Sequence, residues 1–260
     1  MPYIDIEGTR LHYRSAGQGP LALLIHGFPM DSTLWLDQLE ALASLRRCVA
    51  PDLRGFGASD PTSAAVLTME RHADDVSALV AELGDGDGRA DLVVLSMGGY
   101  VTFALCERHP EVVRSLALIS TRTEADDEQG RARRDDAIES VVAEGRGAFA
   151  DGMLGTLLAA DADATPRARL RTMIEGTRVE TIVAAQRGMR ERPDRTHVVE
   201  GLERPIVAIS GREDSLTGPD TMGPLAQRVG ARLEVVDGAA HLPPIERPEA
   251  VNDVLAAFWS

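Results

Sequence analysis

The chain has 260 residues, enough for one large core or for a core domain with an inserted subdomain, and its 44% hydrophobic and 26% charged residues are typical of a soluble globular protein. The 41 acidic residues outnumber the 27 basic ones, and the resulting net charge of −14 argues against nucleic acid or an anionic membrane as partner. The first ten residues lack the basic and apolar parts of a signal peptide, and no apolar run reaches membrane-spanning length. We therefore expect a cytoplasmic protein.

The first third of the chain carries strand and helix patterns in turn. Residues 3–15 alternate apolar and polar side chains around a glycine-containing turn, which predicts a β-hairpin. The continuous apolar run LALLIHG (21–27) predicts a strand that is covered on both faces. A helix should follow, with Ser32 as its candidate cap, before a short strand at 48–50. Residues 68–83 then have the spacing of an amphipathic helix.

The middle of the chain interrupts this alternation. A strand pattern at 91–95 and another at 115–120 are followed by a region, from Thr121 to about Leu202, that contains only helix patterns. Its four helix candidates are 131–144, 148–159, 166–175 and 179–190. The region is too long and too helical for a loop, which indicates an inserted helical cap.

Strand and helix patterns resume after this insertion. The expected elements are a strand at 205–210, a helix near 220–229, a strand at 232–236 and a last helix from about Pro248 to Trp259. We therefore predict an α/β fold, in which a mostly parallel twisted sheet has helices on both faces. Residues 1–120 and 203–260 should form this core, and residues 121–202 the cap.

The stretch DLVVLSMGG (91–99) puts Ser96 on the sharp turn between a buried strand and a helix. The helix N-terminus that follows favours developing negative charge, so this position suits a nucleophilic serine. The pattern is close to G-x-S-x-G, the usual nucleophile elbow, but Val94 takes the place of the first glycine. The alternative is that Ser96 simply caps the helix.

A serine nucleophile needs a base beside it and a third group that orients the base. His241 is the candidate base, because it follows a late strand at the sheet edge where such sites collect. Ordinary structural positions are expected for His12, which should point out of the hairpin, and for His72, His109 and His197. Asp214 follows another strand end and is the candidate third member, with Glu213 as its nearest competitor and a capping role as the alternative.

The oxyanion that forms on attack needs two preorganised hydrogen-bond donors. One should be the backbone N–H of Met97, directly after the nucleophile. The other should come from the loop after the strand at 21–27, from Phe28, because Pro29 has no N–H. Since the chain must turn sharply there, we expect a cis Phe28–Pro29 peptide bond.

Five motifs in the same order resemble the α/β-hydrolase family, in its branch of small capped esterases and lactonases. They are HGFP (26–29), DLRGFGASD (52–60), LSMGG (95–99), GREDSLTG (211–218) and GAAHLPPIERPE (238–249). The resemblance covers nearly the whole chain. It implies Ser96 as nucleophile, His241 as base, Asp214 as the third member, and Phe28 and Met97 as oxyanion donors.

The resemblance also implies that Asp52 and Arg54 have structural roles beside the site. The serine at the elbow separates this chain from relatives that resemble haloalkane dehalogenases and epoxide hydrolases, which carry aspartate there. The departure from the family pattern is Val94, whose β-branched side chain should crowd the elbow. On that reasoning, Val94→Gly should be nearly neutral for stability and should leave turnover equal or higher.

The leading interpretation is a hydrolase that cleaves a small or medium carboxylic ester through an acyl-enzyme. The cap would supply an apolar wall for this small-molecule substrate. The candidate wall residues are Phe149, Met153, Leu154, Leu157 and Leu158. A lactonase of the enol-lactonase type is the alternative, and an arginine or lysine facing a substrate carboxylate would favour it.

Two further functions remain open from the sequence. Pro29, directly after the oxyanion residue, also occurs in relatives with cofactor-free perhydrolase activity. A non-catalytic binding protein on a hydrolase scaffold is least favoured, because such proteins commonly lose the catalytic set. Cys48 and Cys106 lie in apolar patterns outside any metal-ligand spacing, so we expect buried free thiols, with a disulfide between them as the alternative, and no metal site. We also expect no cofactor.

Overall fold

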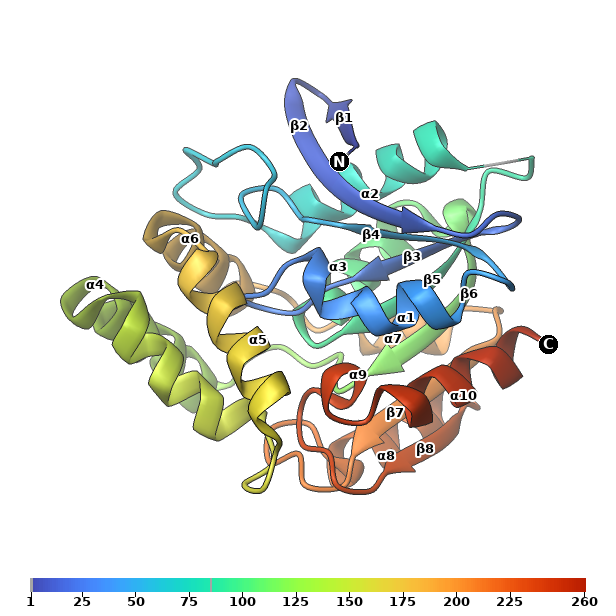
Figure 1. The fold of residues 1–260 in the computed structure, drawn as a ribbon. Coiled ribbons are helices and arrows are strands. Elements are labelled where there is room, and N and C mark those ends of the chain that lie inside the picture. The colour runs from blue at the N-terminus through green and yellow to red at the C-terminus, as the bar shows by residue number, and fades with distance from the viewer. Residues whose placement is uncertain (1, 85) are drawn as a thin grey trace.

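The computed structural model of the protein describes residues 2–84 and 86–260. In this part of the chain eight strands form one sheet, in the order β1-β2-β4-β3-β5-β6-β7-β8 (Figure 1). The strands are β1 Tyr3–Ile6, β2 Thr9–Ala16, β3 Leu21–Ile25, β4 Arg47–Pro51, β5 Ala90–Leu95, β6 Val113–Ile119, β7 Ile206–Gly211 and β8 Arg232–Val236. Only the hairpin strands run antiparallel, β1 to β2 and β2 to β4, so the predicted mostly parallel sheet is confirmed.

Helices cover both faces of this sheet. Helices α1 and α10 pack together on one side, and α2 and α3 pack together on the other (Figure 1). The helices outside the region between β6 and β7 are α1 Leu36–Ala41, α2 Met69–Leu83, α3 Met97–Arg108, α8 Pro219–Arg228, α9 Pro243–Glu246 and α10 Pro248–Trp259, with short 3-10 helices at Ser32–Trp35 and Pro110–Val112. Every residue of β3 and β5 is buried, as expected for apolar strands with helices above and below them.

The region between β6 and β7 is helical, as the sequence predicts. Its members, called the inserted helices below, are α4 Glu128–Leu157, α5 Ala164–Gly176, α6 Val179–Arg190 and α7 Thr196–Glu200. Helix α4 packs against α5 and α6 and spans both of the first two predicted helices, with a kink at Gly145, where φ is 80° (Figure 1). Among the described residues, no helix is both long and apolar enough to cross a membrane.

Two local expectations from the sequence need correction, and one helix was not predicted. The cap of the 3-10 helix is Asp31, whose side chain accepts the N–H of Thr33, rather than Ser32. His12 is buried rather than outward-facing, because the loop that follows β4 covers it and Asp52 binds its ring. The short helix α9 lies in a proline-rich segment, and the sequence pattern does not predict a helix there.

Cys48 and Cys106 are free and buried, as expected, and burial raises the pKa of each thiol to about 12.

Val94 lies in the middle of the sheet, and its surroundings revise the expectation of crowding. Its side chain is fully buried, and the ladder runs through it without a break, opposite Ile25 on one side and Leu118 on the other. The register shift in β5 occurs instead between Ala90 and Asp91. Val94 is therefore a regular, packed residue of the core.

This packing reverses the effect expected for Val94→Gly. Removing a buried valine side chain and adding a flexible glycine should lower the free energy of unfolding by about 2–4 kcal/mol. Denaturant unfolding of the variant and the wild type measures this difference. A loss below about 1 kcal/mol would mean that Val94 is strained after all.

His72 of α2 is a buried histidine with an unusual environment. Both ring nitrogens lack a hydrogen-bond partner in the described chain, and the ring lies 6.2 Å from that of Phe56. Burial lowers the pKa of His72 to about 4, from an ordinary value of 6.5. The folded protein therefore holds this ring neutral at pH values at which the unfolded chain binds a proton.

Acid should consequently destabilise the fold through His72. Between pH 7 and pH 5 the unfolded state binds a proton that the folded state excludes, which should lower the unfolding free energy by about 2 kcal/mol. His72→Leu should remove this part of the pH dependence, whereas His197→Asn, at an exposed position, should not. Urea titrations at both pH values test this. If the unfolding free energy fell by the same amount between pH 7 and pH 5 in the wild type and in His72→Leu, the role of His72 would be contradicted.

Candidate active site

Ser96 occupies the turn between β5 and α3 in a left-handed backbone conformation, with φ 51° and ψ −112°. Such a conformation costs a non-glycine residue on the order of 1–3 kcal/mol and persists only where the surroundings fix it. Here the Ser96 N–H donates to Ile119 O (3.0 Å), and Thr121 Oγ1 donates to Ser96 O (2.8 Å). The Ser96 side chain makes no capping hydrogen bond to α3, which argues against the capping alternative.

Two glycines after Ser96 let α3 approach the sheet closely. A Cβ on Gly98 would lie 2.5 Å from the carbonyl oxygen of Ile25, and one on Gly99 would overlap the side chain of Thr121. Both substitutions would push the helix away from its neighbours. The close approach at this elbow thus depends on Gly98 and Gly99, which explains how the chain tolerates valine at position 94.

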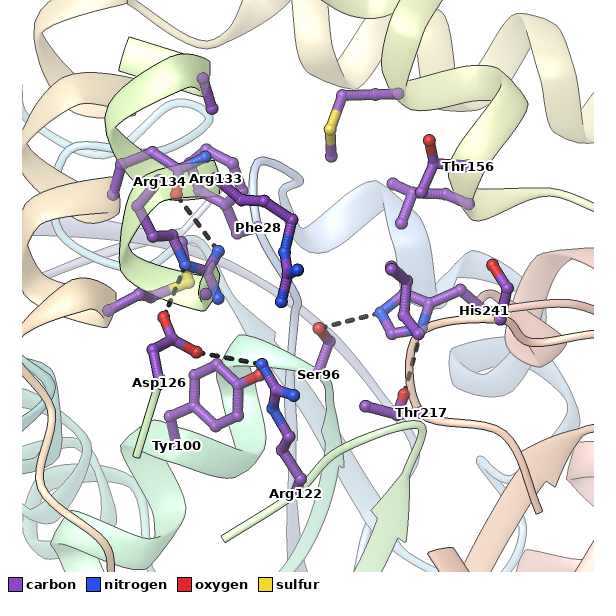
Figure 2. A pocket seen from close by; sticks show the side chains of 18 residues that line it. Phe28, Ser96, Tyr100, Arg122, Asp126, Arg133, Arg134, Thr156, Thr217 and His241 are labelled. Atoms are coloured by element: carbon purple, nitrogen blue, oxygen red, sulfur yellow. Dashed lines mark hydrogen bonds and ion pairs between the residues drawn. The ribbon is translucent and has the colours of Figure 1, made fainter. Parts of the chain in front are cut away.

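The side chains of Ser96, His241 and Asp214 form one row of hydrogen bonds, and Figure 2 shows the part of it that joins Ser96 to His241. Ser96 Oγ lies 2.9 Å from His241 Nε2, and His241 Nδ1 lies 2.9 Å from Asp214 Oδ2. Thr217 Oγ1 donates to the same carboxylate oxygen at 3.0 Å and lies 3.3 Å from His241 Nδ1. Glu213, the competing carboxylate, is exposed and outside this row.

Asp214 is held as a carboxylate. Burial alone would raise its pKa, but the His241 ring and the N–H groups of Thr217 and Leu216 outweigh burial and lower the pKa of Asp214 to about 2. An ionised Asp214 accepts the Nδ1–H of His241 and leaves Nε2 free to accept a proton from Ser96. The arrangement can therefore support general-base chemistry at the Ser96 hydroxyl.

The loop after β3 brings a second backbone donor toward the site. The N–H groups of Phe28 and Met97 make no hydrogen bond within the described part of the chain, and Phe28 lines the same cavity as Ser96. The Phe28–Pro29 peptide bond is cis, as expected. His26 fixes the start of this loop, because its Nδ1 donates to Gly27 O (2.8 Å) and its Nε2 accepts the N–H of Leu53 (3.0 Å).

Asp52 and Arg54 tie the neighbouring loop to the sheet and helices. Asp52 accepts the N–H of Ser32 (2.6 Å) and of Ala58 (2.8 Å), and these bonds hold the pKa of its carboxyl below the ordinary value, although burial would raise it. Arg54 makes a two-pronged ion pair with the buried Asp75 of α2, at 2.7 and 2.8 Å. Both residues thus have the structural role that the resemblance implies.

A cavity of about 550 Å³ lies above Ser96, between the strand ends and the inserted helices (Figure 2). Of the predicted wall residues, Met153 and Leu157 line it. Phe149 instead packs edge-on against Phe28, with ring centroids 6.4 Å apart, while Leu154 and Leu158 belong to the packing behind the wall. The carbonyl of Leu157 also accepts the N–H of His241 at 3.1 Å, so α4 contacts the histidine loop directly.

The opposite wall of the cavity is polar, which the sequence pattern does not predict. Its polar members include Tyr100, Arg122, Asp126, Arg133, Arg134 and Gln186. The available signal was helical spacing in α4, where positions 130, 133, 134 and 137 fall on one face. The larger apolar residues of α4 that line the cavity lie instead near its C-terminal end, so a search for apolar wall residues selects Met153 and Leu157 and passes over the arginines.

Glu246 joins the loop of His241 to the end of α4. Its Oε1 accepts the N–H groups of Ala240 (3.0 Å) and Leu242 (3.1 Å), which flank His241, and its Oε2 accepts the N–H of Ala159 (2.8 Å). Burial raises the pKa of this carboxyl, although the three N–H donors oppose the shift. Glu246 therefore fixes the backbone on both sides of the histidine.

Comparison with known proteins agrees with this architecture. The sequence model of the alpha/beta hydrolase fold matches residues 20–248. Pimeloyl-[acyl-carrier protein] methyl ester esterase of Neisseria meningitidis serogroup A is 30% identical over 237 residues, covering 87% of this chain and 72% of the relative. The chain therefore belongs to the α/β-hydrolase family, as its motifs predict.

Two solved structures are similar over almost the entire chain. A thermophilic esterase from Thermogutta terrifontis, with malate bound, superposes with a TM-score of 0.93 at 33% identity and covers 99% of this chain and 98% of its own. The enol-lactonase from Burkholderia xenovorans LB400 superposes with a TM-score of 0.88 at 28% identity, covering 99% of both chains. The chain is thus similar both to an esterase and to a lactonase.

The contacts of Glu246 can be tested with Glu246→Gln. The amide oxygen can still accept from Ala240 and Leu242, so the amide nitrogen should face the N–H of Ala159, and that bond should be lost. We expect a loss of about 1–3 kcal/mol in unfolding free energy and a clear fall in kcat as the histidine loop loosens. Glu249→Gln, at an exposed position of α10, is the control. Identical stability and turnover in the two variants would contradict this role.

Proposed function

We propose that the protein is a serine hydrolase that cleaves a small or medium carboxylic ester through an acyl-enzyme intermediate. The observation that carries this proposal is the unbroken row of hydrogen bonds from Ser96 Oγ through the His241 ring to the Asp214 carboxylate. The elbow conformation of Ser96 and the family membership of the chain support it. We assign Ser96 as nucleophile, His241 as general base and Asp214 as the group that orients the base.

The reaction would proceed in two halves. His241 Nε2 takes the Ser96 proton as Oγ attacks the ester carbonyl, and Asp214 stabilises the imidazolium that forms. The N–H groups of Met97 and Phe28 would hold the resulting oxyanion, and the proton on His241 would pass to the departing alcohol. Water, activated by the same histidine, would then attack the acyl group on Ser96 and release the acid.

We also propose that residues 121–202 act as a cap over a core formed by 1–120 and 203–260. Met153 and Leu157 would contact the apolar part of the substrate from this cap. Placing the substrate between cap and sheet would limit the access of water to the oxyanion and strengthen its hydrogen bonds.

A lactonase is the second candidate function. The enol-lactonase from Burkholderia xenovorans, similar over 99% of both chains, favours it. Both reactions use the same serine chemistry and differ in whether the leaving alcohol stays attached to the acyl group. The perhydrolase interpretation rests on Pro29 alone, and a non-catalytic binding protein would not need the row of hydrogen bonds at Ser96.

Substitution of Ser96 tests the proposed mechanism. Ser96→Ala should lower the turnover of p-nitrophenyl esters by on the order of 10⁴-fold, because the proposed nucleophile is removed, while substrate binding is largely kept. His241→Ala should cost a similar factor, and the double variant little more. Ser77→Ala, on α2 away from the cavity, is the control. If the double variant lost the product of the two single-variant factors, Ser96 and His241 would not act together as one catalytic unit, and the assignment would be contradicted.

A further inference from the structure

The polar wall of the cavity carries more positive than negative charge. Three guanidinium groups line it, from Arg122, Arg133 and Arg134, and Asp126 is the one carboxylate among the described lining residues. This local excess contrasts with the net charge of −14 of the whole chain. An acidic protein repels anions at long range, so a basic cavity wall of this kind is a specific feature of the site.

Asp126 is already shared by several arginines and cannot neutralise the wall. Its carboxylate lies 3.0 Å from Arg122 and 3.0 Å from Arg134, and a further 2.9 Å contact joins it to Arg192, behind the wall. Burial alone would raise the pKa of Asp126, but Arg192 and Arg134 outweigh burial and lower it to about 2. One negative charge thus faces three positive ones.

Arg133 has no such partner. Within the described residues its guanidinium makes no ion pair and no hydrogen bond to the protein, whereas Arg134 also donates to Gln186 Oε1 (3.1 Å). Figure 2 shows the Arg133 side chain extending from α4 into the cavity toward Ser96, on the side opposite His241. An unpaired guanidinium that faces a serine at the cavity floor is well placed to bind a negative group of the substrate.

We propose that Arg133, supported by the charge excess of Arg122 and Arg134, forms an anion subsite for a free carboxylate on the substrate. This inference rests on the proposed ester hydrolysis at Ser96. The substrate class is an ester or lactone that carries a carboxylate at the far end of its acyl chain, such as the half-ester of a dicarboxylic acid. Met153 and Leu157 would contact the methylene chain between the two ends.

Half-esters and their neutral counterparts test the subsite directly. The wild type should hydrolyse monomethyl adipate with a higher kcat/KM than dimethyl adipate, an ester of the same acyl chain without the free charge. Arg133→Gln should lower kcat/KM for the half-ester by roughly 10- to 100-fold, as expected for the loss of a charged hydrogen-bonding partner. The same variant should keep kcat/KM for the diester within about twofold of the wild-type value. Arg133→Lys should recover part of the loss, because it restores the charge without the planar fork.

A matched control exists on the same helix. Arg131, two residues before Arg133 in α4, is exposed and does not line the cavity. Arg131→Gln should therefore leave kcat/KM unchanged for both the half-ester and the diester. Raising the ionic strength should reduce the preference of the wild type for the half-ester and leave Arg133→Gln unaffected. Since Arg133 has no partner in the described protein, its replacement should not disturb the fold.

A binding measurement separates this inference from the proposed catalysis. In the Ser96→Ala background, calorimetry should detect the binding of monomethyl adipate. Arg133→Gln should weaken this binding by a factor similar to its effect on kcat/KM. If neither ester is hydrolysed but binding depends on Arg133, the proposed function fails and the subsite stands. If the esters are hydrolysed and the wild type prefers the diester, or Arg133→Gln affects both esters equally, the subsite is wrong.

Discussion

The left-handed backbone of Ser96 is the constraint on which the rest of the site depends. The turn can form because Ile119, at the end of β6, and Thr121, just after it, hydrogen-bond the backbone N–H and carbonyl of Ser96, and because Gly98 and Gly99 let α3 pack directly against the sheet. The conformation costs free energy locally, and the surrounding buried strands offset that cost. What the protein gains is a hydroxyl that projects above the sheet, next to the first N–H groups of a helix.

Around this fixed point, buried polar side chains hydrogen-bond the backbone of the loops that carry Phe28 and His241, in addition to the apolar packing of those loops. His26 binds the carbonyl of Gly27, next to Phe28, and Glu246 binds the backbone on both sides of His241. Each of these groups is itself hydrogen-bonded, so burial does not leave a charge unpaired. The polar network thereby fixes the distances between groups that come from distant parts of the sequence.

The sequence predicts the sheet, the inserted helices and the row Ser96, Asp214 and His241, because each depends on a local pattern of apolar runs and the turns that end them. It does not predict the buried position of His12 or the polar cavity wall. These depend on how a distant loop or helix lies across the sheet, which no short pattern encodes. Val94 is a related case, since a rule about one motif position suggested strain, whereas the ladder around it shows ordinary packing.

In the proposed mechanism, Ser96 forms a covalent bond with the acyl group of the substrate. A fluorophosphonate, which forms a stable adduct with activated serine hydroxyls, can test this step without knowledge of the natural substrate. Peptide mass spectrometry after complete inactivation should find one adduct per chain, on Ser96, and the same treatment should leave His241→Ala largely unlabelled. Inactivation with the adduct on another residue, or full labelling of Ser96 without any loss of ester hydrolysis, would contradict the account.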